Sequence, residues 1–140
     1  MDLNAIYNEL IMEHSQMGHN QRKVDRATHS QRGHNPSCGD EIILELRLKD
    51  GVVEDAGFTG VGCAISKAST SMMIDLIKGR SKEEALSLVD TFMGMIKREI
   101  TQDGELMVLE DAIALKNISN LPARVKCALL AWHTLKQTLQ

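Results

Sequence analysis

Apolar and charged residues alternate along one stretch near the middle of the chain. The apolar positions of this stretch are Ile42, Leu44, Leu46 and Leu48. Such alternation is typical of a strand with one buried face. Asp50-Gly51 follows, and this dipeptide favours a tight hairpin turn because both residues tolerate positive φ angles. We therefore expect a second strand, from about Val52 to Thr59, to pair antiparallel with the first.

Helical spacing of apolar residues predicts most of the remaining structure. The expected helices cover residues 2–14, about 64–78, a segment that begins at the Ser81–Glu84 capping box, and a last segment from about Pro122. A short helical turn is expected around 109–115. Residues 15–37 are polar, and we expect a mobile loop with room for one short strand. These elements predict one α+β domain over residues 1–140, with a small antiparallel sheet of about three strands covered on one face by helices.

Composition excludes several classes of function. The chain has 140 residues, 43% of them hydrophobic, and a formal net charge of −3. Neither nucleic acid nor membrane is favoured as a partner by this charge. No apolar run approaches the roughly 20 residues that span a bilayer. The first residues do not resemble a secretory signal, so a cytoplasmic location is expected.

Three cysteines carry the candidate chemistry: Cys38, Cys63 and Cys127. An odd number without an export signal favours reduced thiols over a disulfide framework. The alternative is that each is a small buried apolar residue. All three lie at predicted element boundaries, where a helix N-terminus favours the thiolate, the form that binds metals and attacks sulfur. This placement favours a chemical role.

Asp40 is a candidate fourth member of the same site. It follows Cys38 with only Gly39 between them, so a kink at the glycine lets both side chains reach one point. Three thiolates and one carboxylate form a tetrahedral set that zinc accepts. The chain has no Cys-x-x-Cys pair, so spacing alone does not identify a metal site. An oxygen ligand among sulfurs also indicates a site that can open.

Three segments of the chain resemble the signature segments of a known family. They are Asn-Pro-Ser-Cys-Gly-Asp at 35–40, Gly-Val-Gly-Cys-Ala-Ile-Ser at 60–66 and Leu-Pro-Ala-Arg-Val-Lys-Cys at 121–127. In order and separation they resemble the iron–sulfur cluster assembly proteins of the IscU/NifU N-terminal type, and the resemblance spans nearly the whole chain. Lys126 stands where IscU scaffolds carry a histidine, and Ala123-Arg124 interrupts their chaperone-recognition segment. Both differences are similar to the SufU branch.

The resemblance implies a zinc ion held by four residues: Cys38, Asp40, Cys63 and Cys127. It also implies that the protein accepts persulfide sulfur from a cysteine desulfurase, here of the SufS type, and passes it to downstream Suf assembly proteins. Our hypothesis is that a partner side chain replaces Cys38 at the zinc, and that the released Cys38 thiolate takes the sulfur. Cys38 has the acceptor role because its segment is the most mobile of the three. Arg124 is a candidate for docking or for steering sulfur, with a surface salt bridge as the alternative. Such a protein is a sulfur carrier rather than a conventional enzyme.

Three rival functions remain as alternatives, and the first of them uses the same four residues. The first is a scaffold on which an iron–sulfur cluster is assembled and then transferred, so that a transient cluster replaces zinc. The second is a zinc hydrolase or deaminase, but the chain has no His-x-Glu or His-Glu-x-x-His motif. The third is a structural zinc module that binds partners.

Histidines crowd the N-terminal quarter of the chain. They are His14, His19, His29 and His34. They could form a second metal site or exchange into the zinc site, whereas the alternative is that they are solvated side chains of a polar loop. His14 is expected to pack at a helix end, and His133 to lie on a partly exposed face of the last helix.

Overall fold

The computed structural model describes residues 3–16, 18–36 and 39–140. Along the chain the elements are α1 (Leu3–Gln16), β1 (His29–Asn35), β2 (Asp40–Lys49), β3 (Val52–Val61), α2 (Ala64–Ile77), α3 (Lys82–Ile96), α4 (Asp103–Leu106), the 3₁₀ helix η1 (Met107–Asn120) and α5 (Pro122–Leu139). Among the helices of these ranges, none has the length and apolar character needed to cross a membrane.

The three strands form one antiparallel sheet in the order β1-β2-β3. The predicted hairpin is confirmed: Asp50 and Gly51 have φ angles of 54° and 77° in the turn between β2 and β3. The predicted alternation is confirmed as well, because Ile42, Leu44 and Leu46 on β2 are all at most 1% exposed. One face of the sheet therefore belongs to the core.

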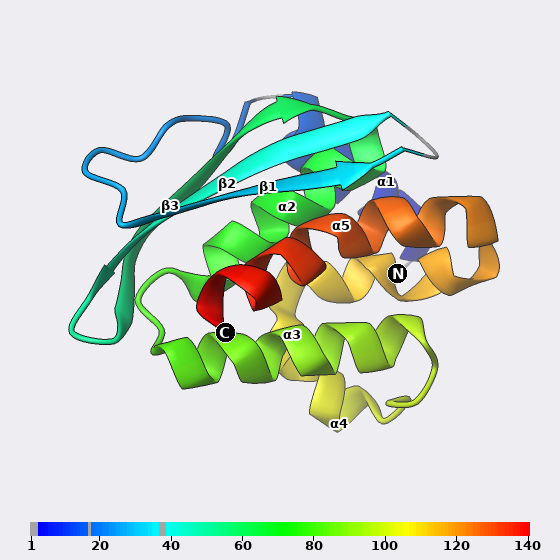
Figure 1. Ribbon diagram of the computed structural model, residues 1–140. Coiled ribbons are helices and arrows are strands. Elements are labelled where there is room, and N and C mark those ends of the chain that lie inside the picture. Colours follow the sequence, from blue (N-terminus) through cyan, green and yellow to red (C-terminus); the bar gives the residue numbers. More distant parts are fainter. Residues whose placement is uncertain (1–2, 17, 37–38) are drawn as a thin grey trace.

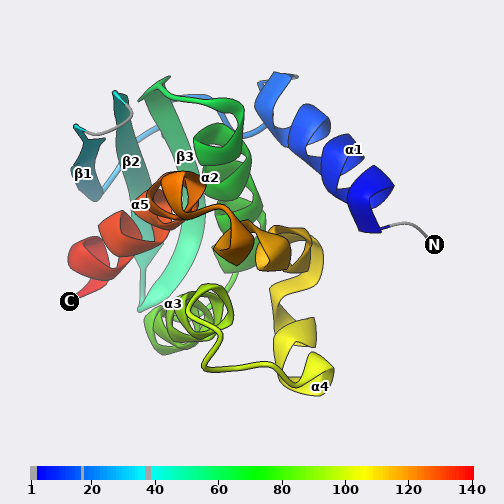
Figure 2. The same ribbon diagram turned by 90° about the vertical axis from the view of Figure 1, so that its right-hand side faces the viewer.

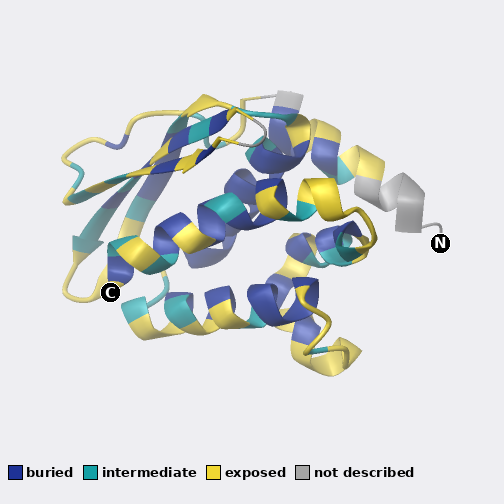
Figure 3. Ribbon diagram, turned by 45° about the vertical axis from the view of Figure 1, so that its right-hand side comes forward, coloured by how far each residue is buried: buried dark blue, intermediate teal, exposed yellow. Residues whose placement is uncertain are grey.

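Helices cover this face of the sheet in two layers. Figures 1 and 2 show α2 and α5 against the sheet, with α1 beside α2 and α3 on the far side of α5. Buried residues line the inner sides of the strands and helices, and exposed residues lie on their outer sides (Figure 3). The predicted α+β architecture, with helices on one face of a three-stranded sheet, is confirmed.

A buried polar contact fixes α5 relative to α2. The ring of Trp132 on α5 stacks on Phe92 of α3, with centroids 4.1 Å apart. The Trp132 indole N–H donates to Ser69 Oγ on α2 at 2.9 Å, and the Ser69 hydroxyl donates to the carbonyl of Ala128 at 2.6 Å. Because Ser69 and Trp132 are both fully buried, these hydrogen bonds are shielded from water.

The predicted ends of α2 and α3 are confirmed. The helix α2 ends at Ile77, and Gly79 follows with a φ of 82°. At the start of α3, the Glu84 N–H donates to Ser81 Oγ at 3.1 Å, and Glu84 Oε1 accepts from the Ser81 N–H at 3.2 Å. The capping box thus pairs donors that helix geometry leaves unpaired.

Strand β1 lies inside the polar segment 15–37, for which the sequence predicts a loop with room for one short strand. Its core-facing positions include Gly33 and Asn35, both buried, instead of large apolar residues. Pairing with the edge of β2 from His29 to Asn35 supplies its backbone hydrogen bonds. The strand therefore forms through its partner rather than through a hydrophobic pattern of its own.

The short helical turn expected around 109–115 is in fact longer, from Met107 to Asn120, and follows the one-turn helix α4. The buried residues of this segment occur every third position: Leu109, Ala112, Leu115 and Ile118. A period of three matches a 3₁₀ helix. The segment is interrupted at Glu110, which has a φ of 49° and a ψ of −124°.

Candidate metal centre

Asp40 is the first residue of β2, and its side chain is buried. It lies in phase with Ile42 and Leu44 on the core-facing side of the strand, and it is only 1% exposed. A carboxylate in such a position needs compensating partners. Its Oδ1 atom accepts a hydrogen bond of 2.9 Å from the backbone N–H of Cys63. This contact joins the start of β2 to the start of α2.

Cys63 is the N-terminal cap of α2. Its backbone is extended, with φ −72° and ψ 169°, and its Sγ accepts a hydrogen bond of 3.4 Å from the N–H of Ser66. Its Sγ also lies 3.9 Å from Asp40 Oδ2. A sulfur at this end of a helix faces the positive end of the helix dipole, which suits a negatively charged ligand.

Cys127 completes the described part of the site from the second turn of α5. It is 1% exposed, and its Sγ lies within 4.8 Å of one ligand atom each from Asp40 and Cys63. The structure thus brings together three of the four predicted ligands, from three separate segments. The fourth, Cys38, lies outside the described residues.

Arg124 lies one turn before Cys127, on the exposed first turn of α5. Its backbone N–H donates to the carbonyl of Leu121 at 2.8 Å, which secures the start of the helix after Pro122. Arg124 and Lys126 are both exposed, so two basic residues lie within three positions of the buried Cys127 in the sequence.

Sequence reasoning missed two features that shape this site. The backbone N–H of Ser66 donates to the Cys63 sulfur. This contact could have been predicted, because a residue at the N-cap of a helix accepts hydrogen bonds from N–H groups of the first turn. Gly60 has a φ of 124°, and a Cβ atom there would lie 2.1 Å from the carbonyl oxygen of Glu41. A side chain at residue 60 would therefore push β3 away from the start of β2, where Asp40 lies.

The acidic neighbour of Asp40 has a different role. Glu41 Oε1 and Oε2 accept hydrogen bonds of 2.9 and 3.0 Å from Arg32 on β1. The hydrogen bond from Arg32 lowers the pKa of Glu41. Because successive residues of a strand point to opposite faces, this pair lies on the solvent side while Asp40 points into the core.

The donor set and spacing fit a zinc ion. In a tetrahedral zinc site the bond lengths place neighbouring donors about 3.6 Å apart for sulfur and oxygen, and about 3.8 Å for two sulfurs. The Cys63 sulfur and Asp40 oxygen are 3.9 Å apart, and all three donors lie within 4.8 Å of one another. These separations are therefore within about 1 Å of those that three ligands of a tetrahedral zinc site need.

The family model for the NifU-like N-terminal domain matches residues 6–140. The chain belongs to this family. It is 42% identical over 140 residues to the iron–sulfur cluster assembly scaffold protein IscU of Thermotoga maritima. This alignment covers all of this chain and 96% of that protein. It is 39% identical over 136 residues to the zinc-dependent sulfurtransferase SufU of Bacillus subtilis, with 97% of this chain and 90% of that protein covered.

Solved structures agree with this family membership. A proposed iron–sulfur cluster assembly scaffold protein for the SUF system from Fervidobacterium islandicum superposes with a TM-score of 0.89 at 37% identity, over 98% of each chain. A NifU-like N-terminal protein from Brucella abortus shares the fold, with a TM-score of 0.82 at 22% identity. The predicted resemblance to the IscU/NifU N-terminal family is confirmed, and SufU is among its relatives within that family.

Proposed function

We propose that this NifU-like domain accepts persulfide sulfur from a cysteine desulfurase at a zinc site, as a carrier in iron–sulfur cluster assembly. The convergence of Asp40, Cys63 and Cys127 from the starts of β2, α2 and α5 supports this proposal. The relative named as a zinc-dependent sulfurtransferase supports it independently.

The four proposed ligands have different tasks. Zinc, when bound, holds the thiols as thiolates and limits their oxidation. Cys63 and Cys127 retain the metal because both are anchored on helices that pack in the core. Asp40 supplies the one oxygen ligand, and its Oδ1 remains hydrogen-bonded to the Cys63 N–H. Cys38 would be the exchangeable ligand, which a side chain of the desulfurase would replace.

Sulfur transfer is then a thiol–persulfide exchange at Cys38. Its thiolate attacks the terminal sulfur of the desulfurase persulfide, and a new S–S bond forms on Cys38. The S–S bond of the donor breaks, and the desulfurase cysteine leaves as a thiolate. No external oxidant or reductant is needed, because the sulfur already has the required oxidation state. Cys38 then carries the persulfide away.

Docking is proposed to use the surface around the thiols. Arg124 and Lys126 provide positive charge beside Cys127, and Val61 and Leu121 are apolar residues that are 66% and 53% exposed in the flanking segments. A mixed basic and apolar surface suits a protein partner. We propose a desulfurase of the SufS type, followed by downstream Suf proteins, in the reducing cytoplasm.

Mass spectrometry tests the proposal directly. The zinc-loaded protein is mixed with desulfurase and free cysteine, and the expected product carries one added sulfur atom on Cys38. The matched control omits cysteine, which leaves the desulfurase without persulfide. Sulfur mapped mainly to Cys63 or Cys127 in folded, zinc-loaded protein would contradict the assignment.

A scaffold for cluster assembly is the second candidate, and the scaffold relative at 42% identity favours it. Metal analysis of protein isolated without oxygen separates the two functions. Tightly bound zinc that is lost in Cys63→Ser, without iron or sulfide, supports sulfur transfer. Iron with acid-labile sulfide in place of zinc supports the scaffold.

Replacing Asp40 tests the oxygen ligand. Asp40→Ala is expected to weaken zinc binding by at least about 10-fold, since even residues that only orient metal ligands contribute that much. Chelator competition measures the affinity. Glu41→Ala is the matched control, because Glu41 is the adjacent carboxylate and pairs with Arg32 instead. Equal zinc affinity in Asp40→Ala and wild type would show that Asp40 is not a ligand.

A further inference from the structure

A second group of potential metal ligands lies outside the cysteine site. Among the described residues, one atom each of His14, His19 and Asp75 lie within 4.8 Å of one another. His14 is near the end of α1, His19 follows that helix, and Asp75 is in the last turn of α2. Asp75 is 12 residues from Cys63 along α2, which corresponds to about 18 Å of helix.

His14 is held in a fixed orientation. Its side chain is 3% exposed, and Nδ1 lies 2.7 Å from Ser71 Oγ on α2, which fixes the ring. Its Nε2 lies 3.9 Å from Asp111 Oδ2 on η1. If a metal binds at Nε2, the ring proton lies on Nδ1, where Ser71 Oγ can accept it. This is the arrangement typical of histidine ligands, which donate their second N–H to a neighbouring group. The prediction that His14 packs at a helix end is confirmed.

His19 and Asp75 form the open side of the group. His19 Nε2 lies 3.1 and 3.0 Å from the two carboxylate oxygens of Asp75, and both side chains are about half exposed. Asn20 donates to Asp75 Oδ1 at 3.0 Å and to Ser71 Oγ at 3.2 Å. The same amide thus orients Asp75 and the hydroxyl that holds His14.

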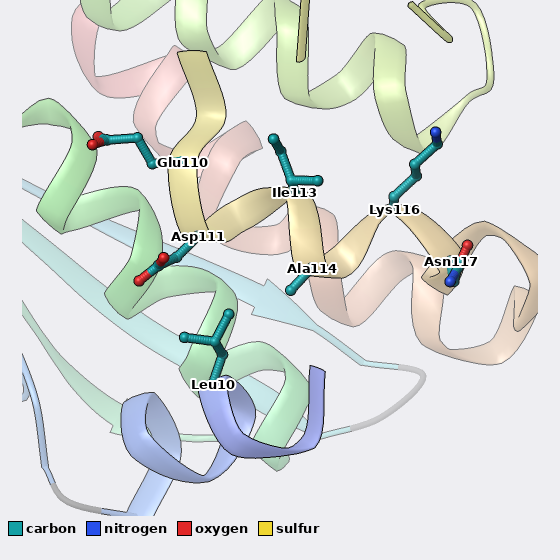
Figure 4. Close-up of a pocket in the computed structure, with 7 residues that line it drawn as sticks. All are labelled: Leu10, Glu110, Asp111, Ile113, Ala114, Lys116 and Asn117. Carbon is teal, nitrogen blue, oxygen red and sulfur yellow. The ribbon is translucent and has the colours of Figure 1, made fainter. Parts of the chain in front are cut away.

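Two adjoining pockets open beside this group. One, of about 210 Å³, is lined by His14, Met72, Asp75, Leu76, Glu110 and Asp111. The other, of about 290 Å³, shares Glu110 and Asp111 with it. Figure 4 shows the side chains of Glu110 and Asp111 leaving η1 toward α2, with Leu10 of α1 close to Asp111. Glu110 has the positive φ that interrupts η1, so backbone strain lies at the edge of this acidic pocket.

We propose that His14, His19 and Asp75 form a second site, which binds a zinc-type divalent transition metal ion. Tetrahedral zinc places neighbouring nitrogen and oxygen donors about 3.4 Å apart. The His19 Nε2 to Asp75 oxygen distance of 3.0 Å and the 4.8 Å limit within which all three ligand atoms lie are on either side of this value. Two imidazoles favour zinc, copper or nickel over magnesium and calcium, which prefer oxygen ligands alone.

The bound ion would link two elements that are distant in sequence. His14 and His19 belong to α1 and the segment after it, and Asp75 belongs to α2. The site shares no residue with Asp40, Cys63 and Cys127, so the two sites can be filled separately. Its role is to fasten the N-terminal helix to the helices of the core.

Zinc titration of full-length protein tests this site. Wild-type protein loaded with one equivalent of Zn²⁺ is expected to bind one further equivalent, measured by calorimetry and by metal analysis after dialysis. His19→Gln and Asp75→Asn should each weaken this second binding by at least about 10-fold. His29→Gln is the matched control and should bind as wild type does, since His29 contacts Thr28 and lies outside the group. Thermal melting of each variant without zinc verifies that it is folded.

The outcomes separate the two sites. The proposal is supported if wild-type protein binds a second equivalent of zinc and His19→Gln and Asp75→Asn do not. It is also supported if wild-type protein binds only one equivalent of zinc, and this zinc is lost in His19→Gln and Asp75→Asn but retained in Cys63→Ser. The proposal is overturned if wild-type protein binds one equivalent only and Cys63→Ser, rather than His19→Gln, removes it. It is equally overturned if His29→Gln reduces the second binding as much as His19→Gln does.

Discussion

Cys63→Ser and Cys127→Ser are each expected to abolish zinc retention at the cysteine site, whereas Cys38→Ser should keep the fold and part of that zinc but accept no sulfur. Cys63 caps α2, and Cys127 is buried in α5 at 1% exposure, so both are anchored against helices of the core. A serine hydroxyl stays protonated near neutral pH and does not replace a thiolate at zinc.

Two measurements on the same samples separate these effects. Elemental analysis gives the zinc content per chain, and mass spectrometry gives the sulfur added by desulfurase and cysteine. Ala64→Ser serves as a control, because it introduces a serine next to Cys63 at an exposed position. Full sulfur acceptance by Cys38→Ser would show that another residue is the acceptor.

Zinc removal is expected to lower the melting temperature by more than about 10 °C. A ligand present at 1,000 times its Kd adds about 4 kcal/mol to the free energy of unfolding, and each kcal/mol shifts the melting temperature of a chain of this size by roughly 3–4 °C. The ion would also compensate the buried Asp40 carboxylate beside two sulfurs. Without it, the starts of β2, α2 and α5 lose their common contact.

Circular dichroism melts before and after chelation measure this shift, with the zinc content verified at each stage. Added zinc should restore the original curve. The Asp75→Asn variant is a useful parallel sample. It lacks a ligand of the proposed histidine site, so a change in its melting temperature on chelation comes from the cysteine site. A melting curve that does not change after verified zinc removal would contradict a stabilising role for the metal.

Local signals explain why much of the fold was predictable. The turn at Asp50-Gly51 and the capping box at Ser81 act through backbone angles and hydrogen bonds within a few residues, so the sequence contains the whole cause. Strand β1 depends instead on pairing with β2, and no apolar pattern marks it. The segment η1 has a regular signal, but its period of three is uncommon over such a length.

The candidate site was predictable in its members but not in its geometry. Motif resemblance selected Asp40, Cys63 and Cys127, which the structure brings together. The burial of Asp40 could also be predicted from the alternation along β2, because Asp40 lies two residues before Ile42 and therefore on the same face of the strand. The contact of Asp40 with the Cys63 N–H could not be predicted, since it depends on how β2 meets α2 in space. The same is true of the approach of His19 to Asp75 across 56 residues.

The hydrogen bonds of Ser69 make the site preorganised. By joining Trp132 and the Ala128 carbonyl of α5 to α2, they lock the two helices that carry Cys63 and Cys127. The entropy of bringing these two sulfurs together is therefore lost when the chain folds rather than when metal binds. Ala128 is the immediate neighbour of Cys127, so the lock acts one residue from the ligand itself. If Cys63 and Cys127 hold the proposed zinc, half of its ligands would form a rigid template before the metal binds.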